Sequence, residues 1–288
     1  MSAPTVQVVR LDVEGSAHWA VRTENGHAAL RVGLDNLLQM SLDEARAAVE
    51  SAGAATDLGG TLLPPVDSQE VWAAGVTYER SRAGRVEEST EAGVYDRVYV
   101  ARRPEVFFKA TAERVVADGE PVGIRADSPW NAPEPELGLV LNASGDIFGY
   151  VVGNDVSSRS IEGENPLYLP QAKVYDRSCS LGPGIVPIWA APELPFDIAL
   201  RLQRGDAVAY QESTSTASIT RPFEDLAAWL TAALTFRVGV ILLTGTGIVP
   251  DQSFTLSAGD VVTVDIPGIG TLTNPVVLVG RDLDQEQS

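Results

Sequence analysis

Residues 131–155 read NAPEPELGLVLNASGDIFGYVVGND. Two apolar runs on either side of Asn-Ala-Ser-Gly-Asp predict a β-hairpin, because turn-forming residues separate two segments of strand-like composition. A four-residue loop at 143–146 would pair Asn142 with Ile147 and carry that register to the open end of the hairpin. A loop one residue shorter or longer would turn the second strand over, unless a β-bulge restored the register. The loop therefore decides which side chains of the two strands meet.

Three acidic side chains are expected to share one face of this hairpin. Glu134 and Glu136 project to the same side because side chains alternate along a strand, and the register sets Glu134 opposite Asp155. Carboxylates that converge on a mainly apolar scaffold repel one another unless a cation lies between them. Oxygen-only ligands favour Mg²⁺, with Mn²⁺ or Ca²⁺ as alternatives. On spacing alone, both glutamates could instead be solvent-facing residues of an edge strand.

The composition is that of a folded protein with an acidic surface. At 288 residues, of which 44% are hydrophobic, the chain can bury a large core. The net charge of −18 repels phosphate backbones and anionic headgroups, so we expect no nucleic-acid partner and no membrane partner. No apolar run reaches the roughly 20 residues that span a bilayer. Residues 1–5 lack an export signal, which predicts a cytoplasmic protein. The acidity fits either a solubilising surface or a salty habitat.

Few residues of the chain suit nucleophilic or zinc chemistry. Cys179 is the single cysteine, and it is expected to be a small packed residue because no histidine lies near it in sequence. The two histidines, His18 and His27, both fall in the first tenth of the chain. All but two of the 21 basic side chains are arginine, so Lys109 and Lys173 stand out.

Residues 1–67 are predicted to form a small N-terminal α/β domain. Residues 5–33 have the composition of short strands. Ser41 and Glu44 form a capping box ahead of an alanine-rich helix, and Gly53 offers a stop. The Gly- and Pro-rich segment that follows favours turns and extended backbone, so we place the domain boundary at its end.

Residues 68–288 are predicted to form a mostly β domain, so the fold class is mostly β with α (α+β). Short β-branched runs separated by Gly, Pro, Asn and Asp indicate strands, including 105–109, 136–141, 147–153, 238–243 and 261–266. A helix is expected after Pro222 and should end by Gly239. Its apolar stripe is expected to pack in the core and comprises Phe223, Leu226, Ala227, Leu230 and Leu234.

Five short motifs within roughly residues 70–280 resemble the fumarylacetoacetate hydrolase family. They are Phe107-Phe108-Lys109, Glu134-Pro-Glu136-Leu, Gly153-Asn154-Asp155-Val156-Ser157-Ser158-Arg159, Gln171-Ala172-Lys173 and Leu243-Thr244-Gly245-Thr246-Gly247. The resemblance implies a mixed β-sandwich roll with a metal site of the E-x-E plus Asp type, usually loaded with Mg²⁺. It also implies a keto acid substrate that chelates the ion, a homodimer or homotetramer, and cleavage, decarboxylation, isomerisation or dehydration as the reaction.

Two further segments, 127–131 and 160–175, resemble the branch of 2-keto-3-deoxy sugar-acid dehydratases. Hydrolytic members of the family typically carry a histidine after a G-x-N-Y-type turn, and here Ser81 stands at about that place. The resemblance therefore implies dehydration of an acid such as 2-keto-3-deoxy-D-arabinonate or -xylonate to 2,5-dioxopentanoate. The alternatives are a C–C bond hydrolase or an oxaloacetate decarboxylase of the same family, and a non-catalytic metal- or ligand-binding module.

The resemblance also implies roles for individual residues. Lys173 is the candidate base, because an ammonium beside a cation in a partly dry pocket loses its proton more readily; the alternative is a surface lysine. Arg159 is expected to bind the substrate, or else to form a structural ion pair. Glu162 is expected to bind a hydroxyl or supply the proton, or else to be a solvated loop residue.

Four other residues complete the candidate set. Thr246 could present its hydroxyl and backbone N–H to the substrate carboxylate, with a plain strand-ending turn as the alternative. Ser81 and Glu105 are weaker candidates for the acid or the water-handling group. Lys109 is expected only to screen the carboxylates and is given no catalytic role.

Overall fold

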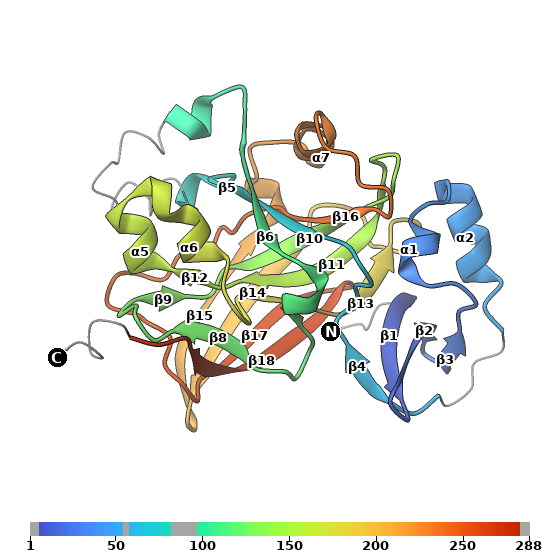
Figure 1. Ribbon diagram of the computed structural model, residues 1–288, viewed down its shortest axis with the longest axis horizontal. Coiled ribbons are helices and arrows are strands. Elements are labelled where there is room, and N and C mark those ends of the chain that lie inside the picture. The colour runs from blue at the N-terminus through green and yellow to red at the C-terminus, as the bar shows by residue number, and fades with distance from the viewer. Residues whose placement is uncertain (1–5, 54–57, 82–96, 283–288) are drawn as a thin grey trace.

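The structure of the chain is a computed structural model that describes residues 6–53, 58–81 and 97–282 (Figure 1). Its N-terminal elements are β1 (Gln7–Val13), β2 (Ser16–Thr23), β3 (Gly26–Ala29), α1 (Leu34–Leu37), α2 (Leu42–Glu50) and β4 (Thr61–Leu63). The next elements carry the centre of the molecule: β5 (Val71–Gly75), β6 (Glu105–Ala110), η1 (Ala112–Arg114), β7 (Val115–Val116), β8 (Val122–Arg125), β9 (Asn131–Ala132), β10 (Pro135–Leu141), β11 (Ile147–Asp155) and β12 (Ser157–Ser158).

The remaining elements begin with two short helices and end with the second sheet. They are α5 (Arg159–Glu164), η2 (Pro166–Tyr168), α6 (Leu169–Lys173), β13 (Cys179–Pro187), β14 (Asp197–Arg204), β15 (Ala207–Ser215), η3 (Thr216–Ser218), α7 (Phe223–Thr231), β16 (Val240–Leu243), β17 (Val261–Ile266) and β18 (Gly270–Val279). The strands dominate, as the sequence predicts. None of the described helices has both the length and the apolar character that crossing a bilayer requires.

Two sheets pack face to face around the main core. The larger has the strand order β3-β2-β1-β13-β11-β10-β16-β5-β6, with β4 beside β1 and β7 beside β13. The smaller has the order β15-β14-β17-β18-β8. Apolar side chains of β10 and β11 meet those of β14, β17 and β18 between the sheets, and all of them are buried. This layered arrangement is the mostly β fold class expected from the sequence.

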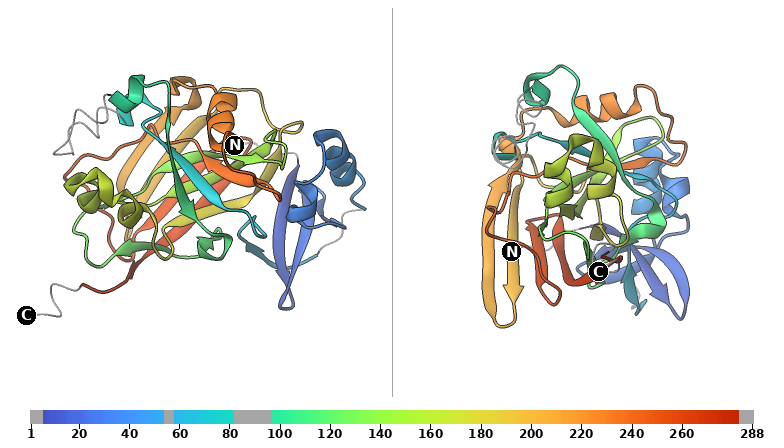
Figure 2. Two further views of the ribbon diagram at one scale, coloured as in Figure 1. Left: turned by 45° about the horizontal axis from the view of Figure 1, so that its top comes forward. Right: turned by 60° about the vertical axis from the view of Figure 1, so that its left-hand side comes forward.

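The N-terminal elements lie at one end of the molecule, opposite α5 and α6 (Figures 1 and 2). The larger sheet continues into them, because β1 pairs with β13 at Val8 and Ile185. A second apolar cluster also joins the two parts, with Leu34 and Leu37 of α1 in the same core as Val140 of β10. The position of the domain boundary at residue 67 stays a prediction.

Local helix signals are partly confirmed. Ser41 and Glu44 form the expected capping box at the start of α2. The helix α7 begins directly after Pro222 as predicted, but it ends at Thr231. Leu234 therefore lies outside the helix and is 42% exposed, so its assignment to the core stripe was wrong. The short helices α5 and α6 were not expected.

The hairpin of β10 and β11 has a longer loop than expected. Leu141 pairs with Ile147, so the loop covers residues 142–146 and the predicted pairing of Asn142 with Ile147 is wrong. A β-bulge leaves Phe148 without a partner across the hairpin, and Val140 pairs with Gly149. From there to the open end the register is the one predicted, because one extra loop residue and one extra strand residue offset each other.

The reactivity of the Cys179 thiol reports how tightly this first residue of β13 is packed. Its side chain is buried, and this desolvation raises its pKa to about 12. We expect the native protein not to react with a thiol reagent such as 5,5′-dithiobis(2-nitrobenzoate) at pH 8, and one thiol per chain to react after unfolding in guanidinium chloride. Rapid labelling of the native protein, followed by absorbance at 412 nm, would contradict this packing.

Candidate metal centre and active site

Three carboxylates converge where β10 and β11 meet at the open end of the hairpin. Glu134 precedes β10, Glu136 lies within it, and Asp155 ends β11. The backbone N–H of Asp155 donates to the Glu134 carbonyl at 2.9 Å, which sets these residues opposite each other as predicted. One oxygen of each side chain lies within 4.8 Å of the others. All three side chains are buried, so the alternative of solvent-facing edge residues is wrong.

The electrostatics of this cluster call for a cation. Burial, and then the charges of Asp155 and Glu134, raise the pKa of Glu136 well above its usual value. The backbone N–H of Gly245 donates to Glu136 Oε2 at 2.6 Å and fixes that carboxylate from the other side. The three protein ligands offer only oxygen, which is the donor set of Mg²⁺, Mn²⁺ and Ca²⁺. The residues present therefore fit the ion that the sequence predicts.

Lys173, the last residue of α6, lies directly against the carboxylates. Its Nζ donates to Glu134 Oε2 at 2.7 Å and to Asp155 Oδ2 at 2.9 Å. The side chain is buried, so the alternative of a surface lysine is wrong. Its Nζ also lies 5.4 Å from the centre of the Phe107 ring on β6, which closes one side of its pocket. The side-chain amine of Lys173 is thus held at the edge of the metal centre.

Lys109 of β6 is the second buried lysine at the same centre. Its Nζ lies 2.5 Å from Asp155 Oδ1. It also donates to the main-chain carbonyls of Val156 at 3.0 Å and Lys173 at 2.6 Å. The expected screening of the carboxylates is therefore accompanied by contacts to the backbone, which tie β6 to the end of α6. Both lysines of the chain meet at Asp155.

Arg159 and Glu162 form the next layer, on α5. Arg159 Nη2 lies 2.8 Å from Glu134 Oε1, and the Ser157 hydroxyl donates to the same oxygen at 2.9 Å. The structural ion pair considered for Arg159 is therefore present, and its contact with a substrate stays a prediction. Glu162 is 3% exposed and its Oε2 lies 4.0 Å from Arg159 Nη1. Glu162 is thus not a solvated loop residue, and its part in catalysis stays a prediction.

The three remaining candidates are Thr246, Ser81 and Glu105. The Thr246 hydroxyl accepts from the backbone N–H of Ile248 at 3.1 Å, which is the geometry of a turn. The Ser81 hydroxyl donates to the carbonyl of Tyr78 at 2.8 Å. Glu105, at the start of β6, is half-buried. Catalytic or substrate-binding roles for these three residues stay predictions.

Some contacts of the metal ligands depend on other parts of the chain and could not be predicted from the local sequence. The backbone N–H of Gly245 and the hydroxyl of Ser157 both support metal ligands, although both residues stand inside the motifs quoted for the family. Their types and positions could have been noted, but their targets could not. Tyr78 was also passed over, and burial followed by the charge of Glu136 raises its pKa. That interaction crosses from the end of β5 to β10.

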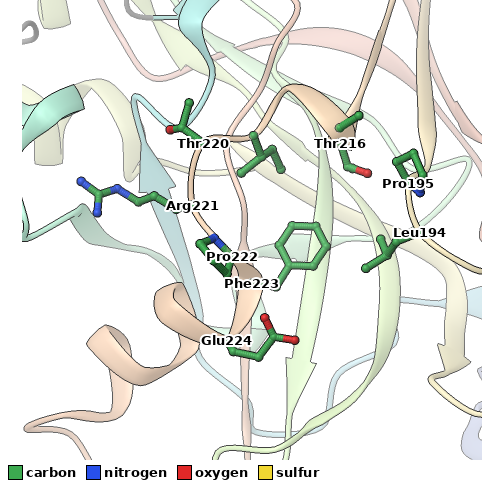
Figure 3. Close-up of a pocket in the computed structure, with 10 residues that line it drawn as sticks. Leu194, Pro195, Thr216, Thr220, Arg221, Pro222, Phe223 and Glu224 are labelled. Carbon is green, nitrogen blue, oxygen red and sulfur yellow. The ribbon is translucent and has the colours of Figure 1, made fainter.

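A surface cavity of about 480 Å³ lies apart from this centre (Figure 3). Its walls are Leu194, Pro195 and residues between Thr216 and Glu224, and none of the metal-site residues lines it. Figure 3 shows the Phe223 ring facing Leu194 and Pro195, while Arg221 points away from them. The lining of this cavity includes Arg221 and Glu224 but no cluster of carboxylates, so the carboxylate centre is the stronger candidate site among the described residues.

Comparisons with known proteins agree with this geometry. Residues 71–277 match the family model described as fumarylacetoacetate (FAA) hydrolase, C-terminal. A probable 2-keto-3-deoxyxylonate dehydratase of Haloferax volcanii is 51% identical over 75% of this chain and 74% of its own. A 2-dehydro-3-deoxy-D-arabinonate dehydratase of Saccharolobus solfataricus is 42% identical over the same shares.

A solved structure supports the likeness across nearly the whole fold. It is a 2-keto-3-deoxy-D-arabinonate dehydratase complexed with magnesium and 2,5-dioxopentanoate, and it matches with a TM-score of 0.83 and 32% identity. The match covers 96% of this chain and 100% of that one. The N-terminal elements are therefore included in the likeness, as well as the two packed sheets.

Substitution of Glu136 by glutamine tests the metal centre. The change removes an anionic ligand but keeps the shape of the side chain, so we expect Mg²⁺ to raise the melting temperature of the wild type and not of Glu136→Gln. Activity should fall by about 100-fold or more, since Lewis-acid stabilisation is worth several kcal/mol. Calorimetric titration with Mg²⁺ and thermal unfolding measure both effects. Wild-type Mg²⁺ affinity in the variant would contradict the assignment.

The raised pKa of Glu136 also predicts how pH affects the metal-free protein. A carboxyl whose folded pKa exceeds its unfolded value of about 4.5 contributes stability below that value and loses it as the pH rises through the folded pKa. In EDTA, the melting temperature should therefore drop more between pH 5 and pH 8 for the wild type than for Glu136→Gln. Equal decreases in melting temperature for the two proteins would show that the charge of Glu136 does not destabilise the folded state.

Proposed function

Because the chain belongs to the fumarylacetoacetate hydrolase family, we propose that it dehydrates a 2-keto-3-deoxypentonate to 2,5-dioxopentanoate in a Mg²⁺-dependent reaction. The observation that carries this conclusion is the amine of Lys173 placed against two carboxylates of a site with metal-ligand chemistry. Two dehydratases of this substrate class are among its relatives, and a structure of the same fold contains magnesium and 2,5-dioxopentanoate. Oxaloacetate tautomerases are more distant relatives.

The reaction removes one water from the substrate. A proton leaves C3 and the hydroxyl leaves C4, which forms a double bond between these carbons. Tautomerisation follows, in which C5 and its hydroxyl each give up one hydrogen and C3 and C4 each gain one, and the product is 2,5-dioxopentanoate. Mg²⁺ held by Glu134, Glu136 and Asp155 supplies Lewis-acid polarisation of the substrate's carboxylate and ketone. The side chains around the centre must then move two protons.

Lys173 takes the proton from C3 in this proposal. Its Nζ is held within 2.9 Å of two metal ligands, so a keto acid bound through its carboxylate and ketone brings C3 next to it. Lys109 holds the main-chain carbonyl of Lys173 at 2.6 Å and so limits where this amine can move. Burial of both side chains keeps bulk water from the amine.

The group that protonates the leaving hydroxyl is assigned to Glu162. Its carboxyl is buried on α5 next to Arg159, whose other guanidinium nitrogen binds Glu134. The helices α5 and α6 lie at the open end of the hairpin, where they contact β12, so a proton donor on α5 is at the same end as the carboxylates (Figure 1). Arg159 and Thr246 are assigned to binding the substrate. Ser81 and Glu105 remain secondary candidates for the acid.

A hydrolase would need a group that activates water. The two histidines of the chain lie on β2 and β3, at the outer edge of the larger sheet and several strands from β11. Neither can therefore pair with a glutamate at the centre. Oxaloacetate decarboxylation would use the same metal and Lys173. Only the substrate that the enzyme consumes distinguishes that reaction from dehydration. A homodimeric or homotetrameric assembly, and which C4 epimer is used, stay predictions.

The substitution Lys173→Met tests the proposed base. Methionine keeps the length of the side chain and removes the amine, so we expect kcat for dehydration to fall by about 10²- to 10⁴-fold, the usual contribution of a general base. Mg²⁺ present throughout offsets the charge left on Glu134 and Asp155. The assay incubates the enzyme with 2-keto-3-deoxypentonate and quantifies 2,5-dioxopentanoate by chromatography.

Exposed Arg46 on α2 provides the control, since Arg46→Met changes a distant basic residue and should leave kcat unchanged. The proposal fails if the wild type does not form 2,5-dioxopentanoate but cleaves an acylpyruvate or releases CO₂ from oxaloacetate. Turnover that resists EDTA would equally remove the role of the metal. Absence of any turnover, together with tight Mg²⁺ binding, would favour the non-catalytic binding module.

A further inference from the structure

The turn that follows β5 is strained and buried. Val76 has φ of 54°, a left-handed conformation that β-branched residues rarely adopt, and it is 6% exposed. Such backbone persists only where surrounding contacts over-determine it, and it is concentrated at functional sites. The residues on either side of Val76 are Gly75 and Thr77, and the side chain delivered by the turn is that of Tyr78.

Contacts from two other segments hold this turn in place. The Thr77 hydroxyl donates to the carbonyl of Thr244 at 2.6 Å. The Thr77 carbonyl accepts from both the backbone N–H and the hydroxyl of Thr220, at 3.1 Å and 3.0 Å. A β-carbon at Gly245 would lie 2.2 Å from the Thr77 hydroxyl, so only glycine allows this approach. The turn is therefore clamped against the same Gly245 whose N–H binds Glu136.

Tyr78 is buried but lies outside the apolar core clusters. It is 1% exposed, yet it belongs to none of the apolar clusters of the described residues. Its ring lies on Gly247, where a β-carbon would come within 2.6 Å of Cδ1. Among the residues that the structure describes, its hydroxyl has no hydrogen-bond partner. Buried phenols nearly always have one, so this hydroxyl indicates a partner supplied by a bound molecule.

The turn that carries Tyr78 packs against Gly245, whose backbone N–H donates to the metal ligand Glu136, so Tyr78 lies beside the metal centre. Burial, and then the negative charge of Glu136, raise the pKa of Tyr78. The phenol therefore keeps its proton at neutral pH and is a hydrogen-bond donor, and it is poorly suited to giving that proton away. Such a group fits a substrate oxygen that stays bound to its carbon throughout the reaction, as a hydroxyl in the substrate and as a carbonyl in the product.

We propose that the Tyr78 hydroxyl donates a hydrogen bond to the C5 hydroxyl of the keto acid and so selects substrates that carry a terminal hydroxyl. This inference rests on the proposed function. The metal takes the carboxylate and ketone, Lys173 faces C3, and Glu162 is assigned to the C4 hydroxyl that leaves. The C5 hydroxyl is the remaining polar group of the substrate, and Tyr78 offers it a buried hydroxyl that has no hydrogen-bond partner among the described residues.

The test pairs one variant with two substrates. Tyr78→Phe removes only the hydroxyl, and 4-hydroxy-2-oxopentanoate is the same keto acid without the C5 hydroxyl. Loss of one neutral hydrogen bond predicts a fall in kcat/KM of about 3- to 15-fold on 2-keto-3-deoxypentonate. On 4-hydroxy-2-oxopentanoate, whose dehydration gives an absorbing enone, kcat/KM should change less than 2-fold. Mg²⁺ affinity should equal that of the wild type.

Stability separates this binding role from a purely structural one. A hydroxyl without a protein partner contributes nothing to the ligand-free fold, so the melting temperature of Tyr78→Phe should be unchanged or higher. Tyr150→Phe is the matched control, because Tyr150 is a buried tyrosine packed on Phe196 in the main core and should show the same kcat/KM on both substrates as the wild type.

Three results would overturn the inference: a lower melting temperature for Tyr78→Phe, an equal fall in kcat/KM on both substrates, or wild-type kinetics on both. Failure of the proposed function itself is distinguishable. In that case the wild type would turn over neither substrate, whereas failure of the inference alone leaves the wild type active and only the pattern of the variant changed.

Discussion

Buried negative charge is the constraint on which this structure depends. Glu134, Glu136, Asp155 and Glu162 lie within the protein, and desolvating a carboxylate is unfavourable unless cations or donors surround it. Lys109, Lys173 and Arg159 supply three positive charges among them. A divalent ion and the carboxylate of one keto acid bring the formal charge of this set to zero. The substrate's charge is thereby matched to the site before any specific contact is considered.

The hairpin of β10 and β11 positions the three metal-binding carboxylates. Strand alternation puts Glu134 and Glu136 on one side, and the register brings Asp155 opposite. Because β10 and β11 are central strands of the larger sheet, their backbone is fixed on both flanks. The lysines come from β6 and α6, and they reach Asp155 from different elements. The site is therefore rigid where ligands are held and is closed by short helices on one side.

The sequence predicted what depends on local pattern and failed where distant segments meet. Strand alternation was enough to bring Glu134, Glu136 and Asp155 together. The predicted loop length was wrong because the Asn142 side chain accepts from the backbone N–H groups of Ser144 and Asp146, which stabilises a five-residue loop. The bulge at Phe148 then restores the predicted register of the two strands. Most strands and the capping box follow from periodicity. The contacts of Lys109 could not be predicted, because β6 is an edge strand separated from β11 by three strands, and the acceptors come from the end of β11, from Val156 after it and from α6.

The same long-range packing decides between elimination and hydrolysis. At the place where the family resemblance leads us to expect a histidine in a hydrolase, the Ser81 hydroxyl donates to the carbonyl of Tyr78, and a serine so engaged cannot draw a proton from water. Hydrolysis also requires a group that activates a water molecule beside the substrate, and the two histidines lie on β2 and β3, several strands from this centre. Elimination uses no water, needs a base at C3 and an acid at C4, and benefits from a dry site because the charges around Lys173 act more strongly there. A centre that retains the metal ligands and the lysine but loses the imidazole is thus suited to removing water and not to adding it.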